Sequence, residues 1–119
     1  MNEVELCRIL SEDNHPYFPK FIELIKEEDK FTVVMECING SPIIKWILNR
    51  KDHLPLKREI EASRLFFKIC GAVAHLHSKG IVHRDIKFDN ILAIEPTEEG
   101  EETEIKVIDF GLSTVLFPQ

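Results

Sequence analysis

The chain has 119 residues, enough for one small domain, and its 44% hydrophobic and 30% charged residues are ordinary for a globular protein. The formal net charge is −6, and six Glu without any Lys or Arg lie between Glu95 and Glu104. Outside that stretch the 15 basic residues are matched by 15 acidic ones (21 less six), so the acidity is local and no nucleic-acid partner is expected.

Three cysteines, Cys7, Cys37 and Cys70, are odd in number and show no metal-ligand or C-x-x-C spacing, so we expect reduced thiols. The first residues carry Glu3 and Glu5 and lack the basic-then-apolar layout of a signal peptide. No apolar run is long enough to cross a membrane. We therefore expect a cytoplasmic or nuclear protein without a membrane partner.

Apolar residues at helical spacing within residues 1–10 predict a helix, and the proline-punctuated stretch 14–20 predicts a turn after it. Residues 21–25 and 31–35 then read as two strands joined by the charged turn 26–30. A helix followed by a β-hairpin is the expected start of the chain.

The sequence G-S-P at 40–42 predicts a break in the secondary structure. Residues 43–48 predict a short helix, and residues 49–55 predict a polar loop. The strongest helix signal spans Lys57–Ser78, and Gly80 supplies its stop. The expected apolar face of this helix repeats at three- and four-residue steps: Leu65, Phe66, Ile69, Cys70, Val73, Leu76 and His77.

Two further strands are predicted at 91–94 and 105–108, on either side of the acidic stretch 95–104. We expect that stretch to be a solvated, mobile tip. The chain shows no internal repeats.

Residues 83–90 read H-R-D-I-K-F-D-N, and the triplet D-F-G follows at 109–111. The pattern H-R-D-x-K-x-x-N followed by D-F-G is the layout of a kinase catalytic loop and its metal-binding aspartate. A solvated charged turn between two apolar strands is the alternative, and two motifs in the right order argue against it. On these residues the chain resembles eukaryotic-type serine/threonine protein kinases.

In that family, phosphoryl transfer depends on positioning and charge neutralisation more than on covalent help. The resemblance implies that Asp85 accepts or orients the proton of the substrate hydroxyl and that Lys87 reaches the γ-phosphate of ATP. Asn90 and Asp109 would bind Mg²⁺, because hard cations take amide and carboxylate oxygens as ligands. ATP and Mg²⁺ are thus the expected cofactors.

Four neighbouring residues would support this site. His83 would pack behind the loop, and Arg84 would pair with a phosphate on the activation segment. Phe110 and Gly111 complete the D-F-G triplet. The resemblance favours the serine/threonine class because tyrosine kinases usually carry Ala or Arg in the part of the loop where this chain has Lys87.

The resemblance also implies where the adenine of ATP would lie. Met35 falls at the gatekeeper position, and Glu36 and Ile38 fall on the hinge, where backbone groups would bond the adenine edge. Leu92 would lie beneath the ring. An ordinary hairpin with Met35 in its core is the alternative.

The first predicted helix, E-V-E-L-C-R-I-L at residues 3–10, resembles the C-helix of kinases. Glu3 would be the glutamate that pairs with a strand lysine, which this sequence does not contain. Glu5 is a weaker candidate for the same role. A carboxylate on the helix surface is the alternative for both.

The resemblance implies an α+β fold, a partial protein kinase domain with an N-lobe remnant and hinge at 1–38 and the start of the C-lobe at 39–119. The amino-acid sequence of residues 61–66 and 77–83 is most similar to that of calmodulin-dependent and AMP-activated kinases. Because the sequence has no G-x-G-x-x-G loop, we expect a longer working form and little phosphoryl transfer to a protein substrate by these 119 residues alone. A non-catalytic kinase-like protein that binds a partner or a nucleotide is the alternative.

Overall fold

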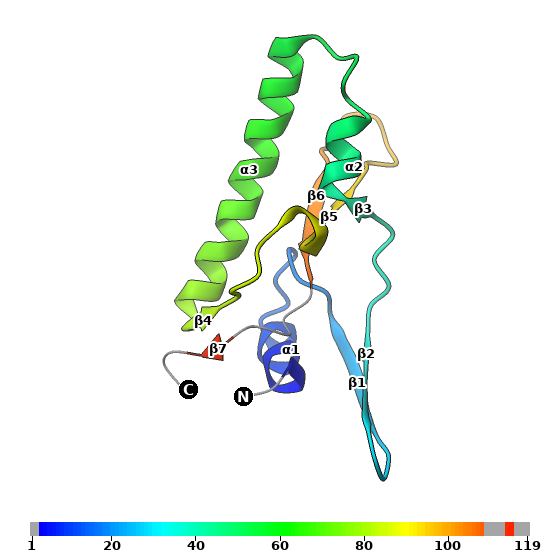
Figure 1. The fold of residues 1–119 in the computed structure, drawn as a ribbon, viewed down its shortest axis with the longest axis vertical. Helices are drawn as coiled ribbons and strands as arrows, with labels where there is room; N and C mark the ends of the chain where they lie inside the picture. The colour runs from blue at the N-terminus through cyan, green and yellow to red at the C-terminus, as the bar shows by residue number, and fades with distance from the viewer. Residues whose placement is uncertain (1–2, 109–113, 116–119) are drawn as a thin grey trace.

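The computed structural model describes residues 3–108 and 114–115 (Figure 1). The helices in these ranges are α1 (Glu3–Glu12), α2 (Ile43–Leu48) and α3 (Pro55–Ser78), with a short 3-10 helix, η1 (Phe88–Asn90). The strands are β1 (Phe21–Lys26), β2 (Phe31–Met35), β3 (Ser41–Pro42), β4 (Ile81–Val82), β5 (Ile91–Ile94), β6 (Glu104–Val107) and β7 (Thr114–Val115). This mixture of helices and antiparallel strands confirms the α+β class expected from the sequence.

The described strands form three small antiparallel sheets. β1 and β2 make a hairpin that projects away from the rest of the molecule (Figure 1). The strands of the central sheet lie in the order β3–β5–β6, and α2 and α3 contact it. β4 pairs with β7, so the chain beyond β6 returns to the start of the loop that joins β4 to β5.

One apolar core joins the three helices to the central sheet. Ile91 and Ala93 of β5 are buried, as are Ile105 and Val107 of β6, because strand residues two positions apart share a face. Full burial of one such aliphatic side chain contributes about 1.5–3 kcal/mol, so this core holds the helices on the sheet. The remaining buried apolar residues are Leu6, Leu10, Phe18, Ile43, Trp46, Leu65, Ala72, Leu76 and Ile81.

The long helix α3 begins at Pro55, two residues before the expected start, because proline suits the first turn of a helix. Gly80 follows its end with a φ of 71°, the left-handed conformation in which glycine ends helices without strain. The buried residues of the helix are Leu65, Lys68, Ala72 and Leu76.

The prediction of which residues form the apolar face of α3 is therefore wrong in part. Phe66, Cys70 and His77 are exposed, Phe66 to 65%. A 3.6-residue period is compatible with burial of either of two neighbouring rows of residues on the helix surface. Packing against β4 and β6 buries the row that contains Lys68. Lysine is tolerated there because its alkyl chain covers apolar surface while its ammonium reaches polar atoms.

The shortest strands are the other departure from expectation. The sequence predicts an interruption at 40–42, whereas Ser41 and Pro42 form β3 and pair with Ala93 and Leu92 of β5. β4 and β7 also have two residues each, too few to show the alternation by which a strand is recognised.

The structure bears on the expectations about membrane spans and about the cysteines. Within residues 3–108, no helix is long and apolar enough to cross a membrane. Cys37 and Cys70 are exposed and carry free thiols, as expected for reduced cysteines.

Gly40 offers a test of how the chain enters the central sheet. A Cβ at this position would lie 2.7 Å from the carbonyl oxygen of Ala93, too close for a real contact. We expect Gly40→Ala to lower the free energy of unfolding by about 1–3 kcal/mol, because backbone must shift to make room. Chemical denaturation of both forms measures this difference.

Gly71→Ala is the matched control, because a Cβ there meets Tyr17 at an ordinary 3.5 Å. Gly71 lies inside α3, where Ala is the better helix former, so this change is expected to add about 0.5–1 kcal/mol. Equal effects of the two substitutions would show that the close approach of Gly40 to β5 is not a constraint.

Candidate active site

The loop between β4 and β5 is organised by one buried histidine. His83 is 3% exposed, and its Nδ1 accepts a hydrogen bond from the backbone N–H of Asp85 at 3.1 Å. The proton of the neutral ring is therefore on Nε2, which donates to the carbonyl oxygen of Ile108 at 3.0 Å. His83 thus lies behind the loop and joins it to the residue that follows β6.

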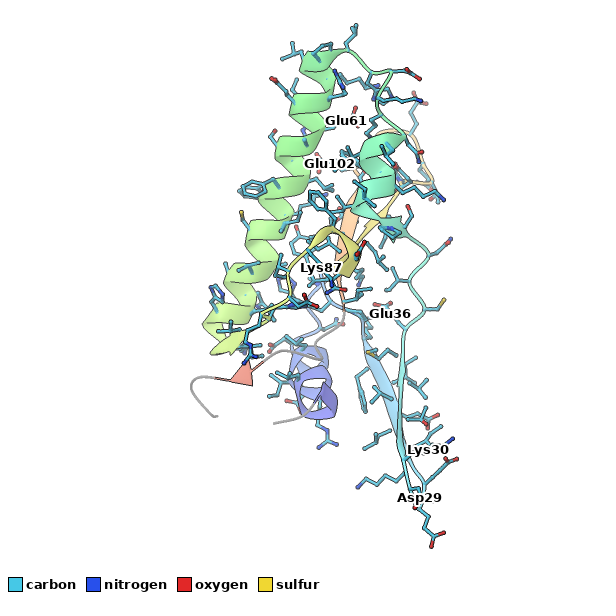
Figure 2. The ribbon with its side chains drawn as sticks, viewed as in Figure 1. Asp29, Lys30, Glu36, Glu61, Lys87 and Glu102 are labelled. Carbon is cyan, nitrogen blue, oxygen red and sulfur yellow. The ribbon has the colours of Figure 1, made fainter. Side chains whose placement is uncertain are left out.

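Three of the residues expected to act in catalysis lie together on this loop. The Nδ2 of Asn90 donates to the backbone oxygen of Asp85 at 2.9 Å and to its Oδ2 at 3.0 Å. The Nζ of Lys87 lies 3.6 Å from the Oδ1 of Asp85 (Lys87 is labelled in Figure 2). Asn90 is buried, whereas the Asp85 and Lys87 side chains are partly open to solvent.

The orientation of the Asn90 amide follows from its two acceptors. A flipped amide would place Oδ1 against the two oxygens of Asp85, so Nδ2 must face them and Oδ1 must point elsewhere. Oδ1 is consequently the atom of Asn90 that can serve as a cation ligand.

Ile108 is held to the loop by both of its backbone polar groups. Its carbonyl oxygen accepts from His83, and its N–H donates to the backbone oxygen of Asn90 at 2.9 Å. Asp109, Phe110 and Gly111 come next and lie outside the described residues. The description resumes at Thr114, which pairs with Val82 directly before the loop. Both described flanks of the D-F-G triplet therefore lie against the loop.

Arg84 has a backbone conformation that the sequence does not reveal. Its φ is 68°, in the left-handed region that non-glycine residues seldom occupy, and its side chain is exposed. The turn that lets the N–H of Asp85 reach back to His83 includes this residue. Strain of this kind costs about 1–3 kcal/mol and concentrates at functional sites. Pairing of Arg84 with a phosphate stays a prediction.

The expected hinge follows β2. Met35 is its last residue and is 38% exposed rather than in the core. The backbone N–H of Glu36 donates to the carbonyl oxygen of Lys20 at 2.8 Å, so this N–H is already used. Groups that bond adenine would have to come from the Glu36 carbonyl or from the next residues, up to the half-buried Ile38.

Leu92 lies half-buried in the middle of the central sheet. It pairs with Pro42 on one side and with Lys106 on the other. Met35, Ile38 and Leu92 do not line the cavity of about 600 Å³ that lies between α2, α3 and the loop joining β5 to β6. Their role in binding adenine stays a prediction.

Sequence reasoning missed Lys106 of β6. Its Nζ donates to Oε1 of Glu36 at 3.0 Å and to the backbone oxygen of Phe18 at 3.2 Å. Next to it, the N–H of Val107 donates to the backbone oxygen of Tyr17 at 2.8 Å. The strand that leads to D-F-G is therefore tied both to the hinge and to the turn before β1. The position of this lysine between the apolar residues Ile105 and Val107 could have indicated from the sequence that it has a polar partner inside the fold.

Glu3 is the first residue of α1, but its side chain and that of Glu5 lie outside what the structure describes. The helix itself is oriented by Leu6 and Leu10, which are buried in the core. The proposed pairing of Glu3 with a lysine therefore stays a prediction.

Comparison with known proteins gives consistent matches along the whole chain. A model of the protein kinase domain matches residues 1–119. CDPK-related kinase 4 of Arabidopsis thaliana is 39% identical over 111 residues, 93% of this chain. Ovarian-specific serine/threonine-protein kinase Lok of Drosophila melanogaster is 35% identical over 113 residues, 95% of this chain. Ribosomal protein S6 kinase 2 alpha of Xenopus laevis is 35% identical over 114 residues, 96% of this chain.

These relatives are much longer than the present sequence. The 119 residues span 17% of the Arabidopsis protein, 22% of the Drosophila protein and 14% of the Xenopus protein. The similarity therefore bears on one segment of each relative.

Replacing His83 tests whether it organises the loop. His83→Phe keeps an aromatic ring but leaves the N–H of Asp85 and the carbonyl of Ile108, both partly buried, without this partner, at a cost of about 1 kcal/mol each. The free energy of unfolding should fall accordingly. His77→Phe, on the exposed side of α3, should change it by less than about 0.5 kcal/mol. Similar small effects of both changes would remove His83 from this role.

The contact between Glu36 and Lys106 predicts a dependence of stability on pH. Burial alone would raise the pKa of Glu36, but hydrogen bonds from Lys106 and the backbone of Lys20, with their charges, outweigh it and leave the pKa below the usual 4.5. A carboxyl with a lowered folded-state pKa stabilises the fold above about pH 4.5, and this contribution is lost as the pH falls through the folded pKa.

Unfolding free energies measured from about pH 6 to about pH 3 check this expectation. Glu36→Gln should flatten the acid limb of the curve, and Lys106→Met should flatten it too, since it removes the partner that lowers the pKa. Glu28→Gln, in the exposed turn of the hairpin, serves as control. An acid limb unchanged in all three variants would show that Glu36 carries no such linkage.

Proposed function

Because this chain belongs to the protein kinase family, we propose that it supplies the catalytic loop of a serine/threonine kinase, which transfers the γ-phosphoryl group of ATP to a protein hydroxyl. The observation that carries the proposal is the contact set of Asp85, Lys87 and Asn90 on one loop. Their side chains supply a carboxylate, an ammonium and an amide oxygen in one place, which is what phosphoryl transfer requires.

Each residue has a distinct task in this proposal. Asp85 accepts or orients the hydroxyl proton of the protein substrate, and its carboxylate is held by Asn90 in a fixed orientation before substrate arrives. Lys87 is more exposed, so its ammonium can turn from Asp85 toward a phosphate without leaving a buried charge unpaired. His83 fixes the backbone that carries all three.

The donor set also fits a hard cation. The Oδ1 of Asn90 is left for a ligand by the orientation of the amide, and Asp109 would add a carboxylate. Bound Mg²⁺ would neutralise the negative charge of the phosphates. Arg84, by family resemblance, would pair with a phosphate on the activation segment.

The subgroup and the location complete the proposal. Relatives named CDPK-related kinase 4 and Calcium-dependent protein kinase 4 support a place near calcium-dependent protein kinases. The cytoplasm or nucleus suits a chain with free, exposed cysteines, because thiols stay reduced there. The protein substrate is proposed to carry a serine or threonine hydroxyl.

Two aspartates on the same loop allow a matched test of the proposed reaction. In a form of the protein long enough to include a glycine-rich loop and peptide-binding helices, Asp85→Asn should lower turnover by about 10²–10⁴-fold and leave ATP binding largely intact. Asp89→Asn should have a mild effect, because that side chain is exposed and outside the contact set. Phosphate transfer from labelled ATP to a basic protein substrate measures both.

Equal losses from the two variants would show that the base is assigned to the wrong residue. A long form without measurable transfer, but with ATP or partner binding, would favour the non-catalytic alternative. The 119-residue chain is the third arm and is expected to transfer little phosphate, since positioning of substrates can contribute about 7–11 kcal/mol to lowering the barrier.

A further inference from the structure

Two histidines stack on each other where the turn between α1 and β1, residues 13–20, lies against α3. The ring centroids of His15 and His75 are 4.1 Å apart, and the ring planes are inclined by 29°. Phe18, which is 2% exposed, lies beside both rings, with centroid distances of 5.4 Å to His15 and 5.8 Å to His75. This histidine pair is therefore part of the packing that holds the turn on the helix.

A backbone hydrogen bond fixes the protonation state of His15. Its Nδ1 accepts from the N–H of Tyr17 at 3.2 Å, so this nitrogen carries no proton in the described arrangement. The proton of the neutral ring is on Nε2, and a second proton on the ring would therefore go to Nδ1. That proton would point at the N–H of Tyr17 and break the bond, so the turn keeps its form only around a neutral His15.

His75 faces a carboxylate that is already in use. Its Nε2 lies 3.3 Å from Oδ2 of Asp13 and makes no hydrogen bond among the described residues. Oδ1 of Asp13 lies 3.1 Å from Nζ of Lys79. Of the side chains that the structure describes, Asp13 is the one carboxylate within ion-pair distance of either histidine ring. Asp13 could offset a proton on His75, but a further proton on His15 would find this carboxylate shared with Lys79.

The charged groups around the pair come from three segments: Asp13 from the turn, His75 and Lys79 from the end of α3, and Lys106 from β6. The pKa of His15 lies below its ordinary 6.5, first because the ring is partly buried and next because of the charge of His75. Lys106 lowers the pKa further, and Asp13 offsets only part of the effect. A neutral His15 therefore stabilises the fold above about pH 6.5, and this contribution is lost as the pH falls through the folded-state pKa.

The same turn is bonded to β6 through its backbone. The carbonyl oxygen of Tyr17 accepts from the N–H of Val107 at 2.8 Å, and that of Phe18 accepts from Nζ of Lys106 at 3.2 Å. Ile108, the next residue after β6, holds the loop of the candidate active site through both of its backbone polar groups. Displacement of the turn would therefore loosen the strand end that orders this loop.

We propose that His15 and His75 form a proton-sensitive contact that links the order of β6 to pH. With no more than one proton added to the pair, the rings stay stacked and the turn stays on α3. A second proton places two positive charges on rings 4.1 Å apart and removes the acceptor of the Tyr17 N–H, so the rings separate and the turn leaves α3 and β6. Acidification thus loosens the support of the candidate active site while the apolar core stays packed.

Amide hydrogen exchange on the full 119-residue chain measures this release at single residues. Each rate is compared with that of an unstructured peptide at the same pH, which removes the pH dependence of exchange itself. From about pH 7 to about pH 5.5, the protection of the Val107 and Ile108 N–H groups should fall about tenfold, and that of Ala72 inside α3 should fall much less. This range lies above pH 4.5, where the Glu36 carboxylate does not contribute.

Two variants remove one histidine each. His15→Asn keeps an acceptor for the N–H two residues later but cannot be protonated, so the fall in Val107 protection should disappear. His75→Phe keeps a ring against His15 but no second charge, so the fall should become smaller. His77→Asn, on the exposed side of α3, is the matched control and should respond like the wild type.

Several outcomes would overturn the proposal. They are constant protection of Val107 in the wild type, an undiminished fall in either variant of the pair, or loss of the fall in His77→Asn. Equal losses at Val107 and Ala72 would show that the whole chain unfolds instead. Circular dichroism at about pH 7 checks each variant, and one folded variant of the pair is enough to decide. Asp85→Asn should respond like the wild type, so failure of the catalytic proposal would not affect this result.

Discussion

The backbone of Ile108 is the point on which the candidate active site depends. Its carbonyl is bonded to His83 and its N–H to Asn90, so one residue joins the end of β6 to both halves of the loop. The ring of His83 is held in one tautomer by the same contacts, because the N–H of Asp85 occupies its other nitrogen. A change at any of these groups would therefore reach the others without passing through the apolar core.

The rest of the fold extends this arrangement outward. Lys106 of β6, two residues before Ile108, connects this strand to Glu36 and to the backbone of Phe18. Arg50 and Lys68 perform a similar task at the far end of the molecule, where they tie α2 and α3 to the acidic loop between β5 and β6. In both places largely buried cations join segments that are distant in sequence. Partial burial strengthens such contacts relative to those of fully exposed pairs.

The sequence predicted the elements whose signals are local. The long helix, the first hairpin and the catalytic motif follow from periodicity, turn residues and fixed spacing, and Asp85, Lys87 and Asn90 lie together as the motif implies. The elements it did not predict depend on long-range pairing. β3 and β7 are two residues long and exist only through their partners, and Lys68 looks like a surface residue until Glu102 and Glu104 are brought to it.

The left-handed conformation of Arg84 was beyond sequence reasoning for a different reason. Nothing in its side chain favours that backbone, which is imposed by the neighbours His83 and Asp85 through their own hydrogen bond. The reverse holds for Gly80, where residue type and conformation agree and the end of α3 was predicted correctly. Residue type and backbone conformation therefore disagree at Arg84 in the candidate active site and agree at Gly80 after α3.

The pairing of β6 with the turn before β1 has a consequence during synthesis. The bond from Lys106 to the backbone oxygen of Phe18 joins residues 88 positions apart, so the N-terminal segment cannot complete its packing until β6 has left the ribosome. At about 5–20 residues per second this delay is roughly 4–18 s. Throughout that interval Leu6 and Leu10 of α1 lack part of the apolar core that buries them in the finished fold.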